Sequence, residues 1–355
     1  KVEAYSIFIE RAIELLKKNG ILNYITPYTY ISGVYFSKLR QFLSKLDVKK
    51  MLLLGKKIFE AAEVDTSILF ICNNKNEFVN DILLADLRET KIEQRFENVC
   101  FFKTQRKRFF CKFKEVLFVV PNEQIDLYLK MYAGKCIELT DVIDFYHGIQ
   151  TRGNKNALSD KQCLGLKPII KGADFNRYKL PKVKTYMNFT KEHIKSGGDL
   201  SYYDLPSKLI IRTTADRIVA SIDYDQNLVL NSVNVGKLRN TDWSLEYILG
   251  IINSKLIEFW YRLSVQETAK TFAEVKIVYM ERIPICEINR DKQSALSSLV
   301  RKVLEEHVGD GSFRILIERI DFLVYHLYGL TYDEVLVVDP DTPITREEYE
   351  AYKGE

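Results

Sequence analysis

Residues 4–43 read AYSIFIERAIELLKKNGILNYITPYTYISGVYFSKLRQFL and alternate between helical and extended patterns. Apolar residues between positions 2 and 18 recur at the spacing that lines one face of a helix, and Gly20 supplies a signal for the end of that helix. Residues 21–26 then form a short extended run closed by a proline, and residues 35–45 carry a second helical pattern. Helix, strand and helix in this order predict a parallel α/β layer.

Further along the chain the pattern changes character twice. Apolar runs at residues 48–54 and 64–72 are long enough for buried strands, which we expect near the middle of a sheet. The pattern loosens between residues 77 and 121, where we expect a boundary. From residue 139 to residue 290, short β-like runs separated by Gly, Asn and Asp turns indicate a separate domain.

Helical patterns return in the last third of the sequence, at residues 245–265, 292–307 and 313–327. The final residues are acidic, and we expect them to be loosely ordered. Together these changes predict three parts, residues 1–121, 122–290 and 291–355.

The composition is that of a folded protein, with 46% hydrophobic and 28% charged residues among 355. The formal net charge of +4 permits an acidic partner such as nucleic acid without demanding one. Six cysteines without CxxC spacing favour reduced thiols, and four histidines without HxH or HExxH spacing predict no metal site. No apolar run approaches the ~18 residues that cross a bilayer, and the amino terminus does not resemble an export signal, so we expect a cytoplasmic protein.

Several blocks of the sequence resemble one enzyme family and occur in its order. Residues 4–43, and IFEAAEVDTSILFI at 58–71, are similar to segments that follow the catalytic motif of adenine-specific DNA methyltransferases of the TaqI type. Four later blocks resemble the specificity domain of that family: KPIIKGADFNRY, KLIIRTTADRIVASID, LEYILGIINSKLIEFWYR and KTFAEVKIVYMERIPI, at residues 167–178, 208–223, 245–262 and 270–285. IDFLVYHLYGLTYDEV, at 320–335, resembles the closing helical segment of type IIG restriction-modification enzymes.

This resemblance implies an α/β fold in three parts. Residues 1–121 would be the C-terminal half of a Rossmann-like methyltransferase sheet, residues 122–290 a mixed α+β target-recognition domain, and residues 291–355 a helical tail. The intact protein would transfer a methyl group from S-adenosylmethionine to adenine N6 in a restriction-modification system. This chain would supply the surface that binds double-stranded DNA, and a missing N-terminal portion would supply the methyltransferase centre and, in bifunctional relatives, a nuclease.

The cofactor and catalytic motifs of the family are absent from the sequence. The family uses a Gly-rich turn between a strand and a helix for S-adenosylmethionine, and an Asn/Asp-Pro-Pro-aromatic loop for the flipped base. Gly309 and Gly311 form a GxG without a preceding strand, and residues 26–28 contain one proline and no carboxamide. We therefore expect no catalytic residue, no bound cofactor and no activity for this chain alone, with the missing motifs upstream of Lys1.

One aromatic residue is a candidate contact for the target base. Enzymes that modify a base extrude it from the duplex and hold it against aromatic or apolar surfaces. By resemblance Phe59 would stack on that base, and Lys56 and Lys57 in the preceding turn would meet phosphate. The alternative is that Phe59 packs beneath its own loop.

Cationic residues in or beside turns are the candidate DNA contacts of the specificity region: Arg152, Lys155, Lys171, Arg177, Arg212, Arg217 and Lys270. Carboxamides accompany them at Gln150, Asn154, Asn156 and Asn231. Arginine can read guanine, and Asn or Gln can read adenine, whereas most lysines hold the phosphate backbone. For any one of them the alternative is a solvated surface turn.

Two other classes of protein remain open at this stage. A non-catalytic specificity subunit would read DNA for separate modification and restriction subunits, and it would lack the methyltransferase-like segment at residues 4–71. A structural or partner-binding α/β protein would carry its basic residues incidentally. DNA affinity that falls steeply with salt would exclude this last class.

Overall fold

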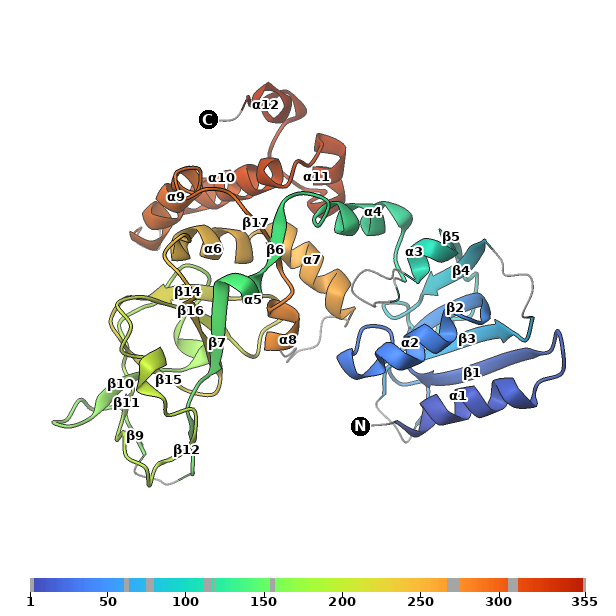
Figure 1. Ribbon diagram of the computed structural model, residues 1–355, viewed down its shortest axis with the longest axis horizontal. Coiled ribbons are helices and arrows are strands. Elements are labelled where there is room, and N and C mark those ends of the chain that lie inside the picture. Colours follow the sequence, from blue (N-terminus) through green and yellow to red (C-terminus); the bar gives the residue numbers. More distant parts are fainter. Residues whose placement is uncertain are drawn as a thin grey trace. The chain divides into compact units, whose positions relative to one another are not determined.

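The computed structural model describes residues 3–60, 64–74, 80–110, 117, 119–153, 157–266, 275–305 and 312–353. The chain folds as two compact units (Figure 1). Unit 1 comprises Lys1–Leu129 and Leu263–Thr268, and unit 2 comprises Lys130–Arg262 and Ala269–Glu355. Unit 1 is blue to teal in Figure 1, and unit 2 runs from green to red.

A five-stranded sheet forms the centre of unit 1. Its strands are β1 (Ile21–Pro27), β2 (Asp47–Gly55), β3 (Thr66–Cys72), β4 (Asp81–Asp86) and β5 (Phe102–Gln105). The order across the sheet is β1-β3-β2-β4-β5, and only β2 and β4 run parallel. The two apolar runs expected near the middle of a sheet are β2 and β3, which confirms that prediction.

The parallel layer expected from the sequence is wrong for most of this sheet. β3 lies between β1 and β2 and is antiparallel to both. The segment that joins Gly55 to Thr66 is shorter than the crossover of about a dozen residues that a parallel neighbour needs, so β3 returns beside β2 in the opposite direction. β2 and β4 are neighbours in the sheet and run parallel, because the whole of β3 lies between them along the sequence.

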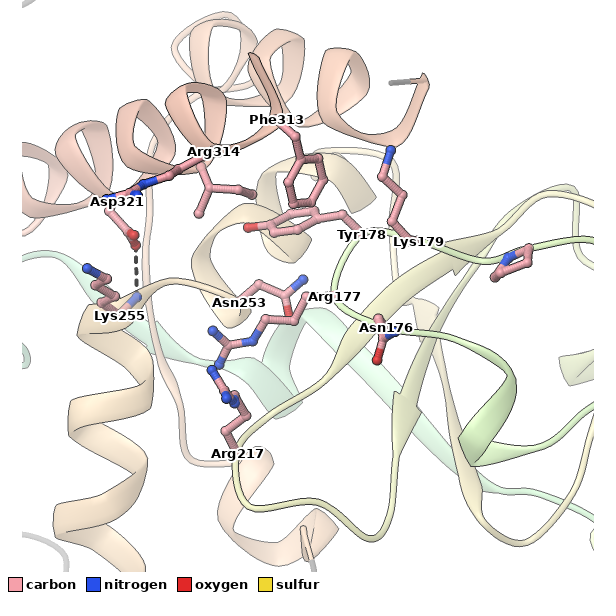
Figure 2. A pocket seen from close by; sticks show the side chains of 12 residues that line it. Asn176, Arg177, Tyr178, Lys179, Arg217, Asn253, Lys255, Phe313, Arg314 and Asp321 are labelled. Carbon is pink, nitrogen blue, oxygen red and sulfur yellow. Dashed lines mark hydrogen bonds between the residues drawn. The ribbon is translucent and has the colours of Figure 1, made fainter. Parts of the chain in front are cut away.

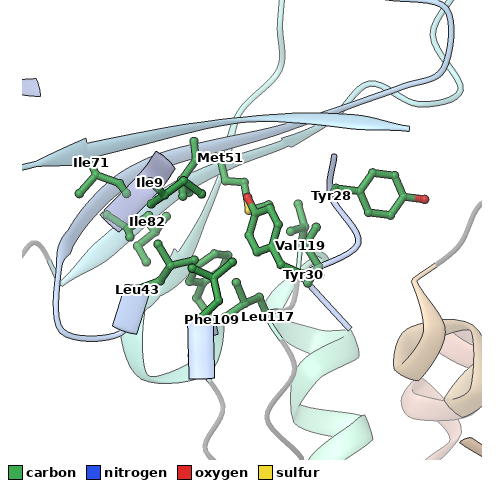
Figure 3. Close-up of a cluster of buried hydrophobic side chains, with 14 of the residues drawn as sticks. Ile9, Tyr28, Tyr30, Leu43, Met51, Ile71, Ile82, Phe109, Leu117 and Val119 are labelled. Carbon is green, nitrogen blue, oxygen red and sulfur yellow. The ribbon is translucent and has the colours of Figure 1, made fainter. Parts of the chain in front are cut away.

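The helices of unit 1 are α1 (Ala4–Leu15), η1 (Val34–Phe36), α2 (Ser37–Leu43), η2 (Ile92–Gln94), α3 (Arg106–Phe109) and α4 (Asn122–Lys130), whose last residue belongs to unit 2. Figure 3 shows the core that α1, α2 and α3 form with the sheet, in which Ile9 of α1, Leu43 of α2 and Met51 of β2 are fully buried. Burying each such side chain stabilises the fold by about 1.5–3 kcal/mol. α1 ends at Leu15, and Asn19 rather than Gly20 takes the left-handed φ of 62° before β1.

Short sheets form the β part of unit 2. A four-stranded antiparallel sheet has the order β14-β13-β16-β7, a second sheet has the order β15-β10-β11-β9, and two pairs are β12-β8 and β17-β6. Their bounds are β6 (Cys136–Glu138), β7 (Ile143–His147), β8 (Gln150–Thr151), β9 (Leu158–Ser159), β10 (Lys167–Ile170), β11 (Tyr186–Met187), β12 (Ile194–Ser196), β13 (Lys208–Arg212), β14 (Ala220–Asp223), β15 (Leu228–Val229), β16 (Val233–Leu238) and β17 (Pro284–Cys286).

The helices of unit 2 come mostly from its second half: α5 (Leu139–Val142), η3 (Gly172–Asp174), η4 (Leu200–Tyr202), α6 (Leu245–Ile252), α7 (Lys255–Val265), α8 (Ile277–Met280), α9 (Ser294–Glu305), α10 (Ser312–Leu327), α11 (Tyr332–Val338) and α12 (Arg346–Ala351). α7 ends inside the segment assigned to unit 1. None of the helices, as far as the described residues extend, is long and apolar enough to cross a membrane.

Two expectations about these helices are wrong. The helix expected over residues 245–265 is divided into α6 and α7, because the Asn253 carboxamide bonds both backbone polar groups of Ala220 and the Ser254 hydroxyl accepts the Ile257 N–H at the start of α7. The acidic end of the chain is also ordered. Hydroxyl caps start α11 and α12, and Tyr349 of α12 is buried, so residues 332–338 and 346–351 form helices.

Candidate nucleic-acid interface

The positive charge of the protein is concentrated in one segment of unit 2. Residues 150–196, which we call the basic lobe, contain eleven Lys and Arg residues against three Asp and Glu residues, a net charge of +8. The whole chain carries only +4, so the remaining residues are acidic on balance. In Figure 1 the lobe includes β9 to β12, at the end of unit 2 away from α9 and α10.

Most of these cations extend into solvent. Six lysines of the lobe are exposed: Lys161, Lys167, Lys182, Lys184, Lys191 and Lys195. Arg152, one of the residues predicted from the sequence, is exposed beside them and donates from Nε to the Ile194 carbonyl at 3.0 Å. The prediction from single turns missed the six lysines, although a count of charge along a sliding window would have found them.

Glycine packing fixes the base of the lobe. Gly197 has a φ of 77°, and a Cβ atom there would come within 2.5 Å of the Gly148 carbonyl oxygen. A Cβ atom on Gly148 would in turn lie 2.1 Å from the Leu230 carbonyl oxygen. These close approaches, together with the hydrogen bond from the Tyr203 hydroxyl to the Gly197 carbonyl at 2.6 Å, hold β8 and β12 against the larger sheet.

Two of the predicted arginines are engaged inside unit 2. Arg177 donates from Nε to the Ile218 carbonyl and pairs with Glu258 at 2.8 Å. Arg212 donates to the Phe175 carbonyl and lies over the Phe175 ring, and burial lowers its pKa. These contacts tie the turn after η3 to β13 and α7. Any contact of these two arginines with DNA stays a prediction.

The other predicted residues of unit 2 lie in different surroundings. Arg217 is exposed and 3.5 Å from Asp216, and Lys171 is half-buried at the start of η3. Asn231 is exposed and Gln150 is half-buried in β8. The remaining four, Lys155, Lys270, Asn154 and Asn156, lie outside the described residues.

Unit 1 places the predicted base-stacking residue at its surface. Lys56 and Lys57 follow β2 and are exposed, and Lys57 has a left-handed φ of 62°. The side chain of Phe59 is 48% exposed. An exposed aromatic two residues after a pair of lysines is a geometry suited to a base and its phosphate. Its role as a stacking residue stays a prediction.

The described residues of both units contain no cluster of three or more His, Cys, Asp or Glu side chains arranged to hold a metal. The candidate contacts are therefore described for each unit separately: the cations of the basic lobe in unit 2, and Lys56, Lys57 and Phe59 in unit 1. Both sets consist of residue types that contact nucleic acids.

Family models match both units. Residues 167–285 match the TaqI-like C-terminal specificity domain, and residues 1–59 match the Eco57I restriction-modification methylase. The resemblance seen in the sequence is thereby confirmed: residues 167–285 are similar to that specificity domain, and residues 1–59 are similar to that methylase.

Individual proteins agree with this assignment. A curated relative from Methanocaldococcus jannaschii, the putative type II restriction enzyme and methyltransferase RM.MjaORFECS2P, is 27% identical over 346 residues. That match covers 92% of this chain and 28% of the relative. The chain therefore spans little more than a quarter of the curated protein that it matches.

One solved structure shares the fold of this chain, and a second matches it more weakly. The type IIL restriction-modification enzyme MmeI in complex with DNA superimposes with a TM-score of 0.62 at 10% identity, covering 99% of this chain and 53% of MmeI. The type IIG restriction endonuclease BpuSI gives a TM-score of 0.41 at 13% identity, covering 97% of this chain and 50% of BpuSI.

Proposed function

We propose that this chain binds double-stranded DNA and forms the target-recognition part of an adenine-N6 methyltransferase of a restriction-modification system. The observation that carries the proposal is the net charge of +8 in the basic lobe, most of which lies within the matched specificity domain. Lysines that neutralise phosphates release counterions, which gives affinity without sequence preference. Arg152 and Arg217 are the exposed arginines that can add base-specific hydrogen bonds.

Among the described residues, the strand-to-helix connection that follows β1 does not fit S-adenosylmethionine, the methyl donor that the family implies. This connection is occupied by the buried side chains of Tyr28, Tyr30 and Ile31, where a cofactor turn would carry glycines. Gly309 and Gly311 lie outside the described residues. In our proposal the donor is held by other parts of the intact protein, and Phe59 of this chain stacks on the extruded adenine.

The alternative of a non-catalytic specificity subunit is less well supported. Residues 1–59 match a methylase rather than a subunit devoted to specificity, and they contribute β1 and β2, two of the five strands of the sheet in unit 1. We further propose that the protein acts in the cytoplasm, where restriction-modification enzymes meet their DNA.

Fluorescence anisotropy with a labelled random-sequence duplex tests the proposal without knowledge of the target. We expect the logarithm of the affinity to fall linearly with the logarithm of the salt concentration. The triple variant K182E/K184E/K191E should lose about tenfold or more in affinity and show a shallower salt slope, because each lysine that meets a phosphate contributes about one unit to the slope.

The matched control is K292E/K302E/K353E, which changes the same charge at three exposed lysines of unit 2 outside the lobe. This variant should bind within about twofold of the unchanged chain, apart from a small long-range effect of charge that salt screens. Equal losses in the two triple variants would reject the lobe as the interface. An unchanged chain that failed to bind duplex DNA at low salt would reject the function.

A further inference from the structure

Unit 2 contains a pocket that includes Arg217, one of the proposed DNA contacts, and residues 176–181 of the basic lobe. Its volume is about 670 Å³, and four segments far apart in the sequence line it. They are the turn at residues 176–181, Arg217 before β14, the junction of α6 and α7, and one face of α10 (Figure 2). This volume is within the range of small-molecule sites.

The walls of the pocket are mainly apolar and aromatic. Tyr178 forms one wall and is 2% exposed, with a left-handed φ of 62° that turns its ring into the pocket. Phe313 and Ile317 lie one turn apart on the face of α10 that lines the pocket, and Figure 2 shows the Phe313 ring next to the Tyr178 ring. Planar groups stack favourably against such rings.

Two buried polar groups in the pocket are incompletely satisfied. The Tyr178 hydroxyl has no hydrogen-bond partner among the described residues. The Asp321 carboxyl is 5% exposed and accepts the Lys255 backbone N–H at 2.8 Å, but the Lys255 ammonium pairs with Asp339 instead. Buried polar groups of this kind are normally hydrogen-bonded, and a ligand with donor groups would complete both.

Cations line the opposite end of the pocket. The guanidinium groups of Arg177 and Arg217 lie at the end away from Phe313 in Figure 2. Arg177 is paired with Glu258 at 2.8 Å. Arg217 is exposed, and its ion pair with Asp216 is longer, at 3.5 Å. An arginine so placed can bind a phosphate through parallel N–H bonds.

From these features we infer that the pocket binds a nucleoside phosphate, with its base against the rings of Phe313 and Tyr178, its amino edge toward Asp321 and its phosphate on Arg217. A purely apolar ligand would give Asp321 and Tyr178 no further hydrogen bond, and inorganic phosphate would leave the aromatic walls uncovered. The ligand is either a free nucleotide or a single unpaired nucleotide of a DNA strand, since both carry the same groups. The three lysines changed in the duplex experiment, Lys182, Lys184 and Lys191, do not line the pocket, and binding to the pocket is measured without duplex DNA.

Isothermal titration of the full chain with adenosine 5′-monophosphate tests this inference. We expect saturable binding, with adenosine and inorganic phosphate each weaker by about tenfold or more because each lacks one half of the contacts. Ile317→Trp fills the pocket and Arg217→Ala removes the phosphate contact, so each should weaken binding by about tenfold or more. Lys302→Ala, an exposed cation of α9 outside the pocket, should leave it unchanged.

A short single-stranded oligonucleotide distinguishes the two sources of the nucleotide. If it displaces the monophosphate from the unchanged chain and fails to do so in Ile317→Trp, the natural ligand is a nucleotide of a strand. If only mononucleotides bind, the ligand is free. Absence of heat with millimolar monophosphate, or equal affinity in the unchanged chain, Ile317→Trp and Arg217→Ala, would overturn the inference, whatever the outcome of the duplex experiments.

Discussion

Lys208 and Asp223 face each other across β13 and β14, with the lysine Nζ 2.6 Å from the Asp223 Oδ2 and both side chains fully buried. Lys208 also donates to the Tyr203 carbonyl, and Asp223 accepts the backbone N–H groups of Asp225 and Asn227. Burial lowers the pKa of Lys208, and the adjacent carboxylate opposes that shift. The pair therefore fixes the turn after β14 and the end of η4, which support the sheet beneath the basic lobe.

Replacing Lys208 with Met should destabilise unit 2 strongly. The substitution leaves the Asp223 carboxylate buried without its cation, and breaking a buried pair in this way costs about 3–5 kcal/mol. Urea unfolding followed by circular dichroism measures the loss. Lys195→Met, at an exposed lysine of β12, is the control and should change stability by less than about 0.5 kcal/mol. A loss for Lys208→Met as small as that of the control would show that the pair does not stabilise the sheet.

The stability of the protein should depend on pH through Asp321. Burial raises the pKa of this carboxyl to about 7, and the Lys255 backbone N–H partly opposes the shift. In the unfolded chain the pKa is about 3.9, so between about pH 4 and pH 7 the folded state holds a proton that the unfolded state has released. The contribution of Asp321 is complete below about pH 4 and is lost as the pH rises to about 7, by up to about 4 kcal/mol.

Asp321→Asn isolates this contribution, because the carboxamide oxygen can still accept the Lys255 N–H but carries no charge. We expect the variant to be more stable than the unchanged chain at pH 8 and to lose less stability between pH 5 and pH 8. Urea unfolding at the two pH values gives the comparison, in which the other titrating groups cancel. Parallel pH profiles for the two proteins would contradict the assignment.

The sequence predicted the elements of this fold better than their directions and ends. Continuous apolar runs identified β2 and β3 as inner strands, because burial on both faces leaves that pattern. The same pattern carries no information on whether neighbours are parallel. The break between α6 and α7 depends on Asn253 bonding Ala220, a partner more than thirty residues away, which no local pattern reports.

Of the two candidate sites, the basic lobe could be predicted from the sequence and the pocket could not. The charge of the basic lobe lies within one stretch of sequence and could be counted before the fold was known. The pocket around Asp321 could not be found in this way, because its lining comes from four separate segments. A buried aspartate in an apolar helix is the only sign of it in the sequence, and that sign does not identify the residues that face it.

A pair of thiols should form a disulfide when the protein is oxidised. Cys136 of β6 lies opposite Cys286 of β17, with their Sγ atoms 3.4 Å apart, although 150 residues separate them along the chain. The hydrogen bond between them lowers the pKa of Cys136 and raises that of Cys286, which burial raises further. Cys136 is therefore the thiol that ionises and attacks an oxidant such as diamide.

Peptide mapping under non-reducing conditions should recover the Cys136–Cys286 link after diamide treatment. The exposed Cys100 and Cys163 are first changed to Ser to prevent links between molecules. Oxidation should raise the urea midpoint, since a cross-link typically stabilises a fold by about 2–4 kcal/mol. Cys136→Ser in the same background should show neither effect, and recovery of both thiols as free after treatment would show that the two strands do not hold them in register.

The edge of the sheet in unit 1 should cause self-association of the isolated chain. Among the described strands, β1 pairs only with β3 and lies at the end of the sheet, and its Ile21 and Ile25 are 62% and 39% exposed. An apolar edge strand pairs readily with another chain, and a lysine on such an edge opposes that pairing. Ile25→Lys should therefore reduce concentration-dependent association in analytical ultracentrifugation.

Ile315→Lys is the control. It changes an equally apolar residue, 66% exposed on α10, and should leave association as it is. If the α10 variant dissociated the chain and the β1 variant did not, self-association would run through unit 2, and the open edge of β1 would have no part in it.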